Sequence, residues 1–179
     1  MTTRVDLCVI GGGSGGLSVA AGAAQLGASV VLFEGHRMGG DCLNTGCVPS
    51  KTLLAAAKAA ARDGVAGPGH YARAKATVRE VIASIAPHDS VERFEGLGVR
   101  VIQHLARFED AKTVVGGDSR VRARRIVIAT GSRPRIPPIS GLETVPYWTS
   151  ETLFSDEHLP TSLIVLGGGP IGLEMAQAH

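Results

Sequence analysis

The start of the chain alternates short apolar runs with one longer helical pattern. Val5–Ile10 is an apolar run that ends at a cluster of glycines, and Ser29–Phe33 is a second apolar run that ends at Glu34. Between them, Leu17–Leu26 is rich in alanine and stops before Gly27. Two short buried strands around one helix predict a β-α-β unit with parallel strands, which takes about 30 residues.

The stretch that follows favours helices. Ser50–Arg62 has strong helix propensity, and Pro49 is tolerated in its first turn because the first N–H groups of a helix have no partner there. Tyr71–Ile85 is a second helical stretch, which Pro87 stops, and Asp89–Phe94 can form a short third helix.

After Gly98 the pattern changes to short strands. Residues 99–102, 112–115 and 121–124 predict a small antiparallel β-meander that leads into residues 125–129, a buried strand of the main sheet. Arg120, Arg122 and Arg124 alternate, so they share one face of a strand, which we interpret as a solvated face.

The last part of the chain repeats the opening pattern. Residues 133–146 are rich in proline and predict a linker. Leu163–Leu166 predicts another buried strand, and GGGPIG and the beginning of a helix follow it.

Composition narrows the class of protein. The 179 residues are 44% hydrophobic and 19% charged, which is a globular balance. The net charge of +2 gives no support for nucleic acid or a membrane surface as partner. No apolar run approaches the ~20 residues of a membrane span, and Met1–Arg4 lacks the layout of a signal peptide, so we expect a cytoplasmic protein.

Two glycine motifs predict two nucleotide sites. Gly11, Gly13 and Gly16 fit G-x-G-x-x-G between a strand and a helix, where a pyrophosphate can reach the helix N-terminus. Glu34 can accept hydrogen bonds from ribose hydroxyls, although a plain turn with a surface carboxylate is the alternative. The motif recurs at Gly167, Gly169 and Gly172, so the chain is expected to use two dinucleotides, one of which hands electrons to the other.

Two cysteines lie five positions apart, at Cys42 and Cys47. They can reach disulfide geometry if the chain bends at Gly46, and the helix N-terminus after Cys47 favours its thiolate. A redox-active disulfide is the favoured interpretation, because structural disulfides are rare in the cytoplasm. Zinc and inert thiols remain open, whereas Cys8, inside a buried strand, is expected to be a core residue.

These residues together resemble a known family. GGDCLNTGCVPSK, with the two glycine motifs, ATGSRP and GLE, is similar to class I pyridine nucleotide–disulfide oxidoreductases, flavoproteins that include dihydrolipoamide dehydrogenase, mercuric reductase and glutathione reductase. The cysteine block is closer to the first two, because glutathione reductase usually carries a second lysine in place of Ser50. The resemblance implies electron transfer between NAD(P)H, FAD and a Cys42–Cys47 disulfide.

The resemblance implies a role for each matching position. Cys47 matches the charge-transfer thiol beside the flavin, and Cys42 the interchange thiol that attacks the substrate. Lys51 and Glu174 match a Lys–Glu pair that lies beside the flavin's reactive nitrogen in this family. The alternative for Glu174 is a carboxylate in the first turn of a helix, where the helix dipole favours negative charge. The implied binding positions are Gly11, Gly13, Ser14, Gly15, Gly16 and Glu34 for the ADP part of FAD, Gly40 and Lys51 along the flavin, Ala106 near the adenine, Thr130, Gly131 and Ser132 over FAD, and Gly167, Gly169 and Gly172 for NAD(P)H.

The implied architecture is α/β. Residues 1–148 would form a Rossmann-like FAD-binding domain, completed by a later segment, with a parallel sheet and a small antiparallel meander. Residues 149–179 would begin a second Rossmann-like domain, for NAD or NADP.

Full-length members are well over twice as long and form homodimers, in which a further domain supplies a His–Glu general base. We therefore expect the 179 residues alone to be inactive, and His179 to be incidental. The expected substrate is a small or protein-bound disulfide of the lipoyl type, or mercuric ion. The alternatives are a non-catalytic FAD-binding module and a flavin oxidase without a redox disulfide.

Overall fold

The computed structural model describes residues 1–179 and consists of two compact units. The first comprises Met1–Cys42 and Ile85–Ser132, and the second comprises Leu43–Ser84 and Arg133–His179. Each unit has a hydrophobic core of its own.

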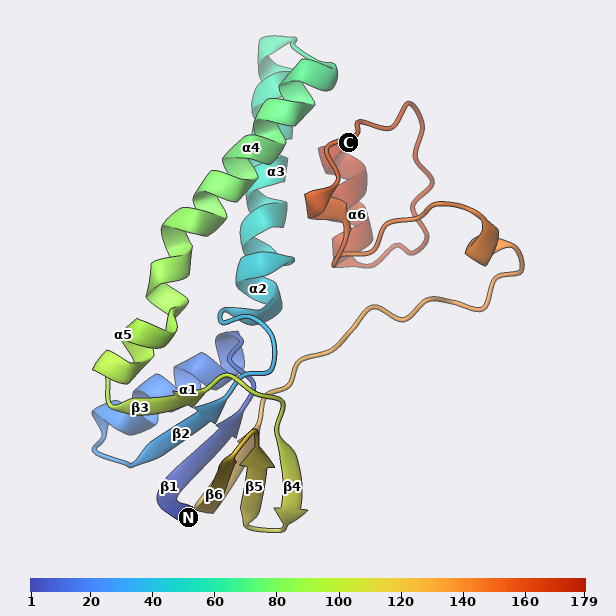
Figure 1. Cartoon of the computed structure of the whole chain (residues 1–179). Helices are drawn as coiled ribbons and strands as arrows, with labels where there is room; N and C mark the ends of the chain where they lie inside the picture. The colour runs from blue at the N-terminus through green and yellow to red at the C-terminus, as the bar shows by residue number, and fades with distance from the viewer. The chain divides into compact units, whose positions relative to one another are not determined.

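The first unit is built on one six-stranded sheet in the order β3-β2-β1-β6-β5-β4 (Figure 1). Neighbouring strands are parallel from β3 to β6, and antiparallel from β6 to β4. The strands are β1 Thr2–Ile10, β2 Val30–Phe33, β3 Val99–Ile102, β4 Arg107–Asp110, β5 Thr113–Gly116 and β6 Ser119–Ile128. The predicted α/β class, with a parallel sheet and an antiparallel meander, is confirmed.

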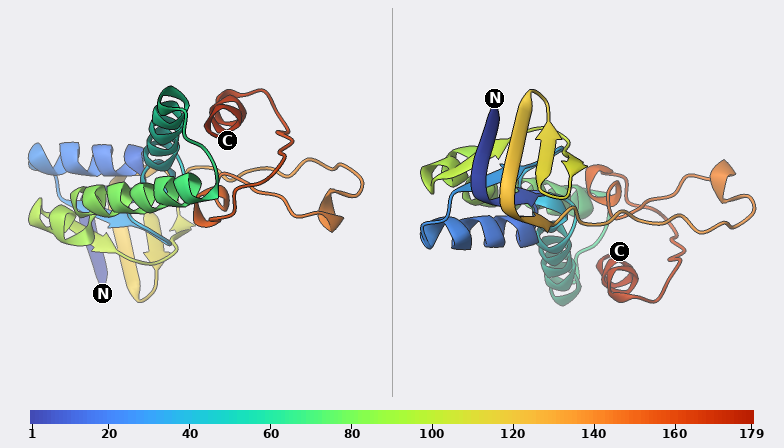
Figure 2. Two further views of the ribbon diagram at one scale, coloured as in Figure 1. Left: turned by 90° about the horizontal axis from the view of Figure 1, so that it is seen from above. Right: turned by 90° about the horizontal axis from the view of Figure 1, so that it is seen from below.

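Both faces of the parallel strands are covered. Helices α1 (Ser14–Gln25) and α5 (Val91–Gly96) lie on one face (Figure 2). There, Leu17 and Phe94 belong to the same buried cluster as Leu32. The other face packs against the inner side of the meander, where Cys8 belongs to the same core cluster as Val121. All four residues of β2 are therefore buried, as expected for a strand covered on both sides.

Cys8 is a core residue, as predicted. It has no exposed surface, and burial raises the pKa of its thiol to about 11.

The predicted boundaries of the meander were wrong in two places. Residues 99–102 form β3, which runs parallel to β2 in the main sheet, and the meander instead consists of β4, β5 and β6. The two strands predicted at 121–124 and 125–129 are one strand, β6. Its first part pairs with β5, while residues 120–128 pair with β1, so one long strand serves both parts of the sheet.

The arginines of β6 confirm the predicted alternation. Arg120, Arg122 and Arg124 are exposed, and the two residues between them are buried. Arg120 forms an ion pair with Glu109 and Arg124 forms one with Asp6, at N···O distances of 2.5 and 3.1 Å. Exposed pairs of this kind contribute little to stability.

The second unit is helical. Its main helices are α3 (Cys47–Asp63), α4 (Pro68–Ile85) and α6 (Pro170–Ala178), and α2 (Gly40–Asn44) spans the boundary between the units. Three 3₁₀ turns occur along the chain, at Ala86–Asp89 (η1), Leu142–Thr144 (η2) and Leu153–Ser155 (η3). None of the helices combines the length and the apolar character that a membrane span needs.

The core of the second unit joins α3, α4, η3 and α6. The buried residues of this cluster are Leu53, Tyr71, Ala74, Val78, Leu153, Phe154, Met175 and Ala178. The predicted linker lies in this unit, and residues 133–140 contain no helix or strand.

The predicted buried strand at Leu163–Leu166 is absent. These residues have no strand hydrogen bonds, and the exposed fractions of Ile164 and Leu166 are 86% and 60%. A parallel strand is stable only beside neighbours that share its backbone hydrogen bonds, and residues 133–179 form no strand at all. The helix predicted after the second glycine motif is present as α6.

Candidate functional site

The first glycine loop lies between β1 and α1 and leaves no room for a side chain at Gly11 or Gly16. Gly11 has φ +109°, and a Cβ there would lie 2.1 Å from the carbonyl oxygen of Ala129. A Cβ on Gly16 would lie 1.8 Å from the carbonyl oxygen of Gly11. The first glycine therefore makes the tight turn and the third lets the helix pack closely on the strand, as the motif predicts.

The middle of this loop faces a second pair of glycines. Gly39 donates a hydrogen bond from its N–H to the carbonyl oxygen of Gly12, with an N···O distance of 2.8 Å. A Cβ on Gly40, which has φ +55°, would lie 2.6 Å from the Cα of Gly13. Two backbone segments distant in sequence thus meet without side chains between them. Sequence reasoning assigned Gly40 but missed Gly39; the Gly-Gly pair was the available signal.

The N-terminus of α1 is open to an anion. Gly13 is its N-cap and provides no side chain, and no acidic residue lies in the first turn. Ser14 and Gly15 are exposed, and nothing lies within 4 Å of a Cβ placed on Gly15. The unbonded N–H groups of a first helical turn attract negative charge, so this surface suits a pyrophosphate.

Glu34 fastens this loop to the end of β2. Its side chain is 9% exposed. One carboxylate oxygen accepts a hydrogen bond from the N–H of Gly12 at 2.5 Å, and the other accepts one from the N–H of His36 at 2.6 Å. The alternative of a surface charge is therefore wrong. Each oxygen keeps a lone pair that can accept a hydrogen bond from a hydroxyl group.

The remaining assigned residues of the first unit lie around this loop. Ala129 donates its N–H to the carbonyl oxygen of Ile10 at 2.8 Å, so Thr130 and Gly131 emerge next to the glycine loop. Gly131 has φ +70°, and a Cβ there would lie 3.7 Å from a carboxylate oxygen of Asp41. Ser132 is exposed. Ala106 is half-buried and packs against the core beneath the meander.

The two cysteines lie in different helices. Cys42 is half-buried in α2, and Cys47 is exposed as the first residue of α3. The predicted helix N-terminus at Cys47 is confirmed, with Gly46 as its N-cap. Cys42 belongs to the first unit, whereas Cys47 belongs to the second.

Lys51 of α3 and Glu174 of α6 form an ion pair within the second unit. Their side chains are 62% and 31% exposed, so both groups reach water. The hydrogen bond from Lys51 is the main cause that lowers the pKa of the Glu174 carboxyl. Glu174 is beyond the first turn of α6, so the alternative of a first-turn carboxylate is wrong.

The second glycine loop repeats the local geometry of the first. Gly167 has φ +113°, and a Cβ on Gly172 would lie 2.2 Å from the carbonyl oxygen of Gly167. Gly169 is the N-cap of α6 and, like Gly13, provides no side-chain cap. This loop can also receive an anion at a helix N-terminus.

The chain matches a known protein family and several curated relatives. The family described as pyridine nucleotide-disulphide oxidoreductase matches residues 5–179. A mercuric reductase of Streptomyces lividans is 38% identical over 192 residues, which cover 98% of this chain and 40% of that protein. A mercuric reductase of Acidithiobacillus ferrooxidans is 36% identical, with 98% of this chain and 35% of that protein covered.

A solved structure has the same fold. The HOCl-induced flavoprotein disulfide reductase RclA of Escherichia coli superimposes with a TM-score of 0.84 at 30% identity, covering 97% of this chain and 39% of that one. This chain therefore spans about 40% of the length of the relatives it matches and corresponds to their N-terminal part. With a family match over nearly its whole length, the chain belongs to the pyridine nucleotide-disulphide oxidoreductases.

Proposed function

We propose that this chain is the N-terminal part of an FAD-dependent disulfide oxidoreductase that passes electrons between NAD(P)H and a Cys42–Cys47 disulfide. The observation that supports it most is the cradle formed by Gly11–Gly16, Gly39–Gly40 and Glu34. It combines an open helix N-terminus, close backbone approach and a buried carboxylate. Those are the features that a pyrophosphate and a ribose require.

FAD fits the residues of this cradle. Gly11, Gly13, Ser14, Gly15 and Gly16 would hold the pyrophosphate, and Glu34 would accept hydrogen bonds from the ribose. Gly40, Ala106 and the loop Thr130–Ser132 would line the rest of the cofactor. The chemistry that FAD supplies when bound is the transfer of two electrons between NAD(P)H and the disulfide. The second glycine loop would receive the NAD(P)H pyrophosphate.

The cysteines would carry the substrate step. In the dithiol form, the Cys42 thiolate attacks one sulfur of a substrate disulfide, forms a mixed disulfide and releases one substrate thiolate. Cys47 then attacks the Cys42 sulfur, releases the second thiolate and restores the Cys42–Cys47 bond. Two electrons leave the pair and two protons reach the product thiols. Cys47, the first residue of α3, is exposed and can make this attack.

Lys51 and Glu174 would support the electron transfer. The Lys51 amine would lie beside a bound flavin, where its positive charge would favour the reduced form, and the Glu174 carboxylate would keep the amine oriented. This role predicts that Lys51→Met lowers the flavin reduction potential in the full-length protein. Glu174→Gln should disturb flavin reduction without weakening NAD(P)H binding much.

The substrate is either a disulfide of the lipoyl type or mercuric ion. Both are chemically suited to a pair of cysteine thiols, because soft thiolates bind soft metal ions and exchange with disulfides. The similarity to mercuric reductases favours the metal ion. We propose a cytoplasmic homodimer for the whole protein, and no steady-state turnover for the 179 residues alone.

Differential alkylation tests the disulfide. The oxidised chain should resist iodoacetamide at Cys42 and Cys47, and mild reduction should expose both, as mass spectrometry of peptides would show. Cys8 is an internal control, because its burial should keep it unreactive in both states. Equal alkylation of Cys42 and Cys47 before and after reduction would exclude a redox pair.

The separate roles of the cysteines need the full-length holoprotein. Two-electron reduction should produce a long-wavelength absorbance from a thiolate beside the flavin. Cys47→Ser should abolish it, whereas Cys42→Ser should show it without any reduction. If both variants behave alike, the assigned roles are wrong.

A further inference from the structure

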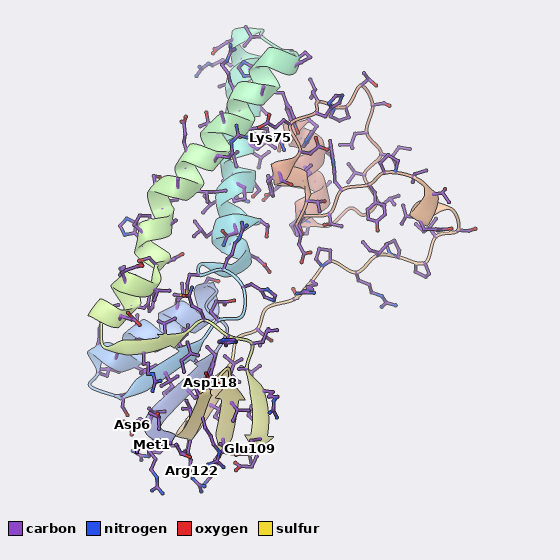
Figure 3. The ribbon with its side chains drawn as sticks, viewed as in Figure 1. Met1, Asp6, Lys75, Glu109, Asp118 and Arg122 are labelled. Atoms are coloured by element: carbon purple, nitrogen blue, oxygen red, sulfur yellow. The ribbon has the colours of Figure 1, made fainter.

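Lys75 is a buried charge that the proposed chemistry does not use. It lies in the middle of α4 with no exposed surface (Figure 3), between the buried side chains of Tyr71 and Val78. Lysine is almost never fully buried unless it has a partner. In the sequence it resembles any other lysine of a helix, so only the structure singles it out.

One backbone carbonyl is the hydrogen-bond partner of this amine. Lys75 Nζ donates to the carbonyl oxygen of Leu153 at 2.6 Å. It also lies 5.1 Å from the ring centroid of Tyr71 and 5.8 Å from that of Phe154. An ammonium group has three donors and an uncharged amine has two, so a single carbonyl acceptor leaves more unmet donors on the charged form. The two ring faces attract the cation and offset this cost only in part. Burial accordingly lowers the pKa of Lys75 to about 8.

The charged and titratable groups around Lys75 come from three elements. On α4 they are Tyr71, whose pKa burial raises to about 12, and Arg79. After η3 they are Asp156 and Glu157, which oppose the lowering of the Lys75 pKa.

The third element is the end of α6, where the C-cap residue His179 has a pKa that burial lowers. Helix α3 supplies only the apolar side chains of Leu53, Leu54 and Ala56 to this cluster. Between about pH 8 and 10.5, Lys75 is therefore the group of this set that changes charge.

Leu153 belongs to a stretch that ties α4 to α6. We name residues 148–159 the docking segment. Its side chains Trp148, Leu153, Phe154 and Leu159 pack in one cluster with Met175 and Ala178 of α6. Trp148 is held within the segment, since its Nε1 donates to a carboxylate oxygen of Asp156 at 2.8 Å. Glu174, the partner of Lys51, lies directly before Met175.

We propose that Lys75 is a pH-dependent positioning residue. Loss of its proton tightens the docking segment on α4 and so holds α6, with Glu174, in place beside Lys51. The proton leaves to solvent, and no other group changes its bonds. The proposal concerns the packing of the second unit and does not depend on flavin chemistry.

The direction of the pH dependence follows from the two states of the amine. When the docking segment leaves α4, Lys75 reaches water and its pKa returns to the ordinary value of 10.5. Between about pH 8 and 10.5 the undocked state therefore binds more protons than the docked state. The docking equilibrium constant therefore rises with pH across this window, by at most about tenfold per pH unit, and is flat below it and above it.

Trp148 provides the test because it is the only tryptophan of the chain. Urea titrations of the full 179-residue chain, followed by Trp148 emission, should show a docking constant that increases on the order of twentyfold from pH 7.5 to pH 9.5. Lys75→Met, which keeps the length but not the amine, should dock tightly with no pH dependence in this range. Lys75→Arg, always charged, should dock weakly at every pH.

The matched control is Lys58→Met, which removes an exposed lysine of α3 and should keep the full pH dependence. A wild-type chain with no pH dependence, or a Lys75→Met chain with the wild-type dependence, overturns the proposal. Hydrogen exchange tests the link to α6: protection of the amides 174–178 should follow the Trp148 response. If Trp148 responds while α6 does not, the coupling to Glu174 is wrong.

Discussion

The two glycine loops are nearly identical in local form and differ in what precedes them. Gly11 and Gly167 have φ of +109° and +113°, and the third glycine of each motif packs on the carbonyl oxygen of the first. Leu17 donates to the carbonyl of Gly13 at 2.8 Å, and Leu173 donates to that of Gly169 at 3.0 Å. The contacts that shape each turn and the start of its helix therefore join residues only a few positions apart in the sequence.

The apolar runs before these two loops differ from each other, because only the first one forms a strand. β1 pairs with β2 on one side and with β6 on the other, and its last three residues are buried. Leu163–Leu166, an equally apolar run, pairs with nothing and is exposed. A glycine turn needs only its own residues, whereas a parallel strand needs neighbours from elsewhere in the chain.

The largest expected difference between the two regions lies in their apolar runs, which form strands only in the first unit. Leu32→Ala removes a side chain with no exposed surface from β2 and should lower the free energy of unfolding by about 4 kcal/mol. Ile164→Ala removes a side chain that is 86% exposed and should change it by less than about 0.5 kcal/mol. Urea titration followed by circular dichroism measures both. A similar loss in the two variants would mean that residues 163–166 are packed after all.

The third glycines provide a closer comparison. A Cβ on Gly16 meets the Gly11 carbonyl and lies 3.3 Å from Val9, which the sheet holds. Gly16→Ala should therefore destabilise the first unit by about 3 kcal/mol. A Cβ on Gly172 meets the same atoms of Gly167 and Val165, but no sheet holds that segment.

We expect Gly172→Ala to cost less than about 1 kcal/mol, because residues 163–167 can move away. The two alanine variants, measured side by side by thermal unfolding, should rank in that order. The reverse order would show that the second loop is the more rigid one.

Glu34 gives the first loop a support that the second lacks. Glu34→Gln keeps the shape but turns an amide N–H₂ towards one of the two backbone N–H donors, Gly12 or His36. We expect a loss of about 1–2 kcal/mol in stability, and weaker retention of FAD by the full-length protein. Glu143→Gln, at an exposed position of η2, is the control and should leave both quantities unchanged.

The smallest effect is expected at the ion pair of the second unit. Glu174 keeps a lowered pKa because Lys51 donates to it, so any stabilisation is present above its ordinary pKa of 4.5 and is lost as the pH falls through the lowered value. Both side chains reach water, and Glu174→Gln should leave the urea midpoint at pH 7 almost unchanged. A large shift, seen by Trp148 emission, would mean that the pair stabilises the unit as well as orienting the lysine.

The predicted elements were most accurate where the signal is local. The helices expected from propensity at Ser50–Arg62 and Tyr71–Ile85 are present within α3 and α4. The strands were less accurate because pairing is decided by residues far apart in sequence. The strand pattern at residues 99–102 did not reveal that these residues pair with β2. The pattern after residue 119 did not reveal that residues 120–128 of β6 pair with β1.

The sequence by itself determined the chemistry that this chain can support. The spacing of a few residues revealed three features: the two glycine motifs, the cysteine pair before a helix and the carboxylate at the end of β2. Such spacing is informative because the geometry of a turn or a helix start is decided within a few residues. Only the tertiary structure decided which of these groups meet. It turned the Glu34 carboxylate onto the Gly12 N–H, brought Gly39–Gly40 against the loop and buried Lys75 under Leu153. Those contacts join segments far apart along the chain, and their energies depend on burial, which no local pattern contains.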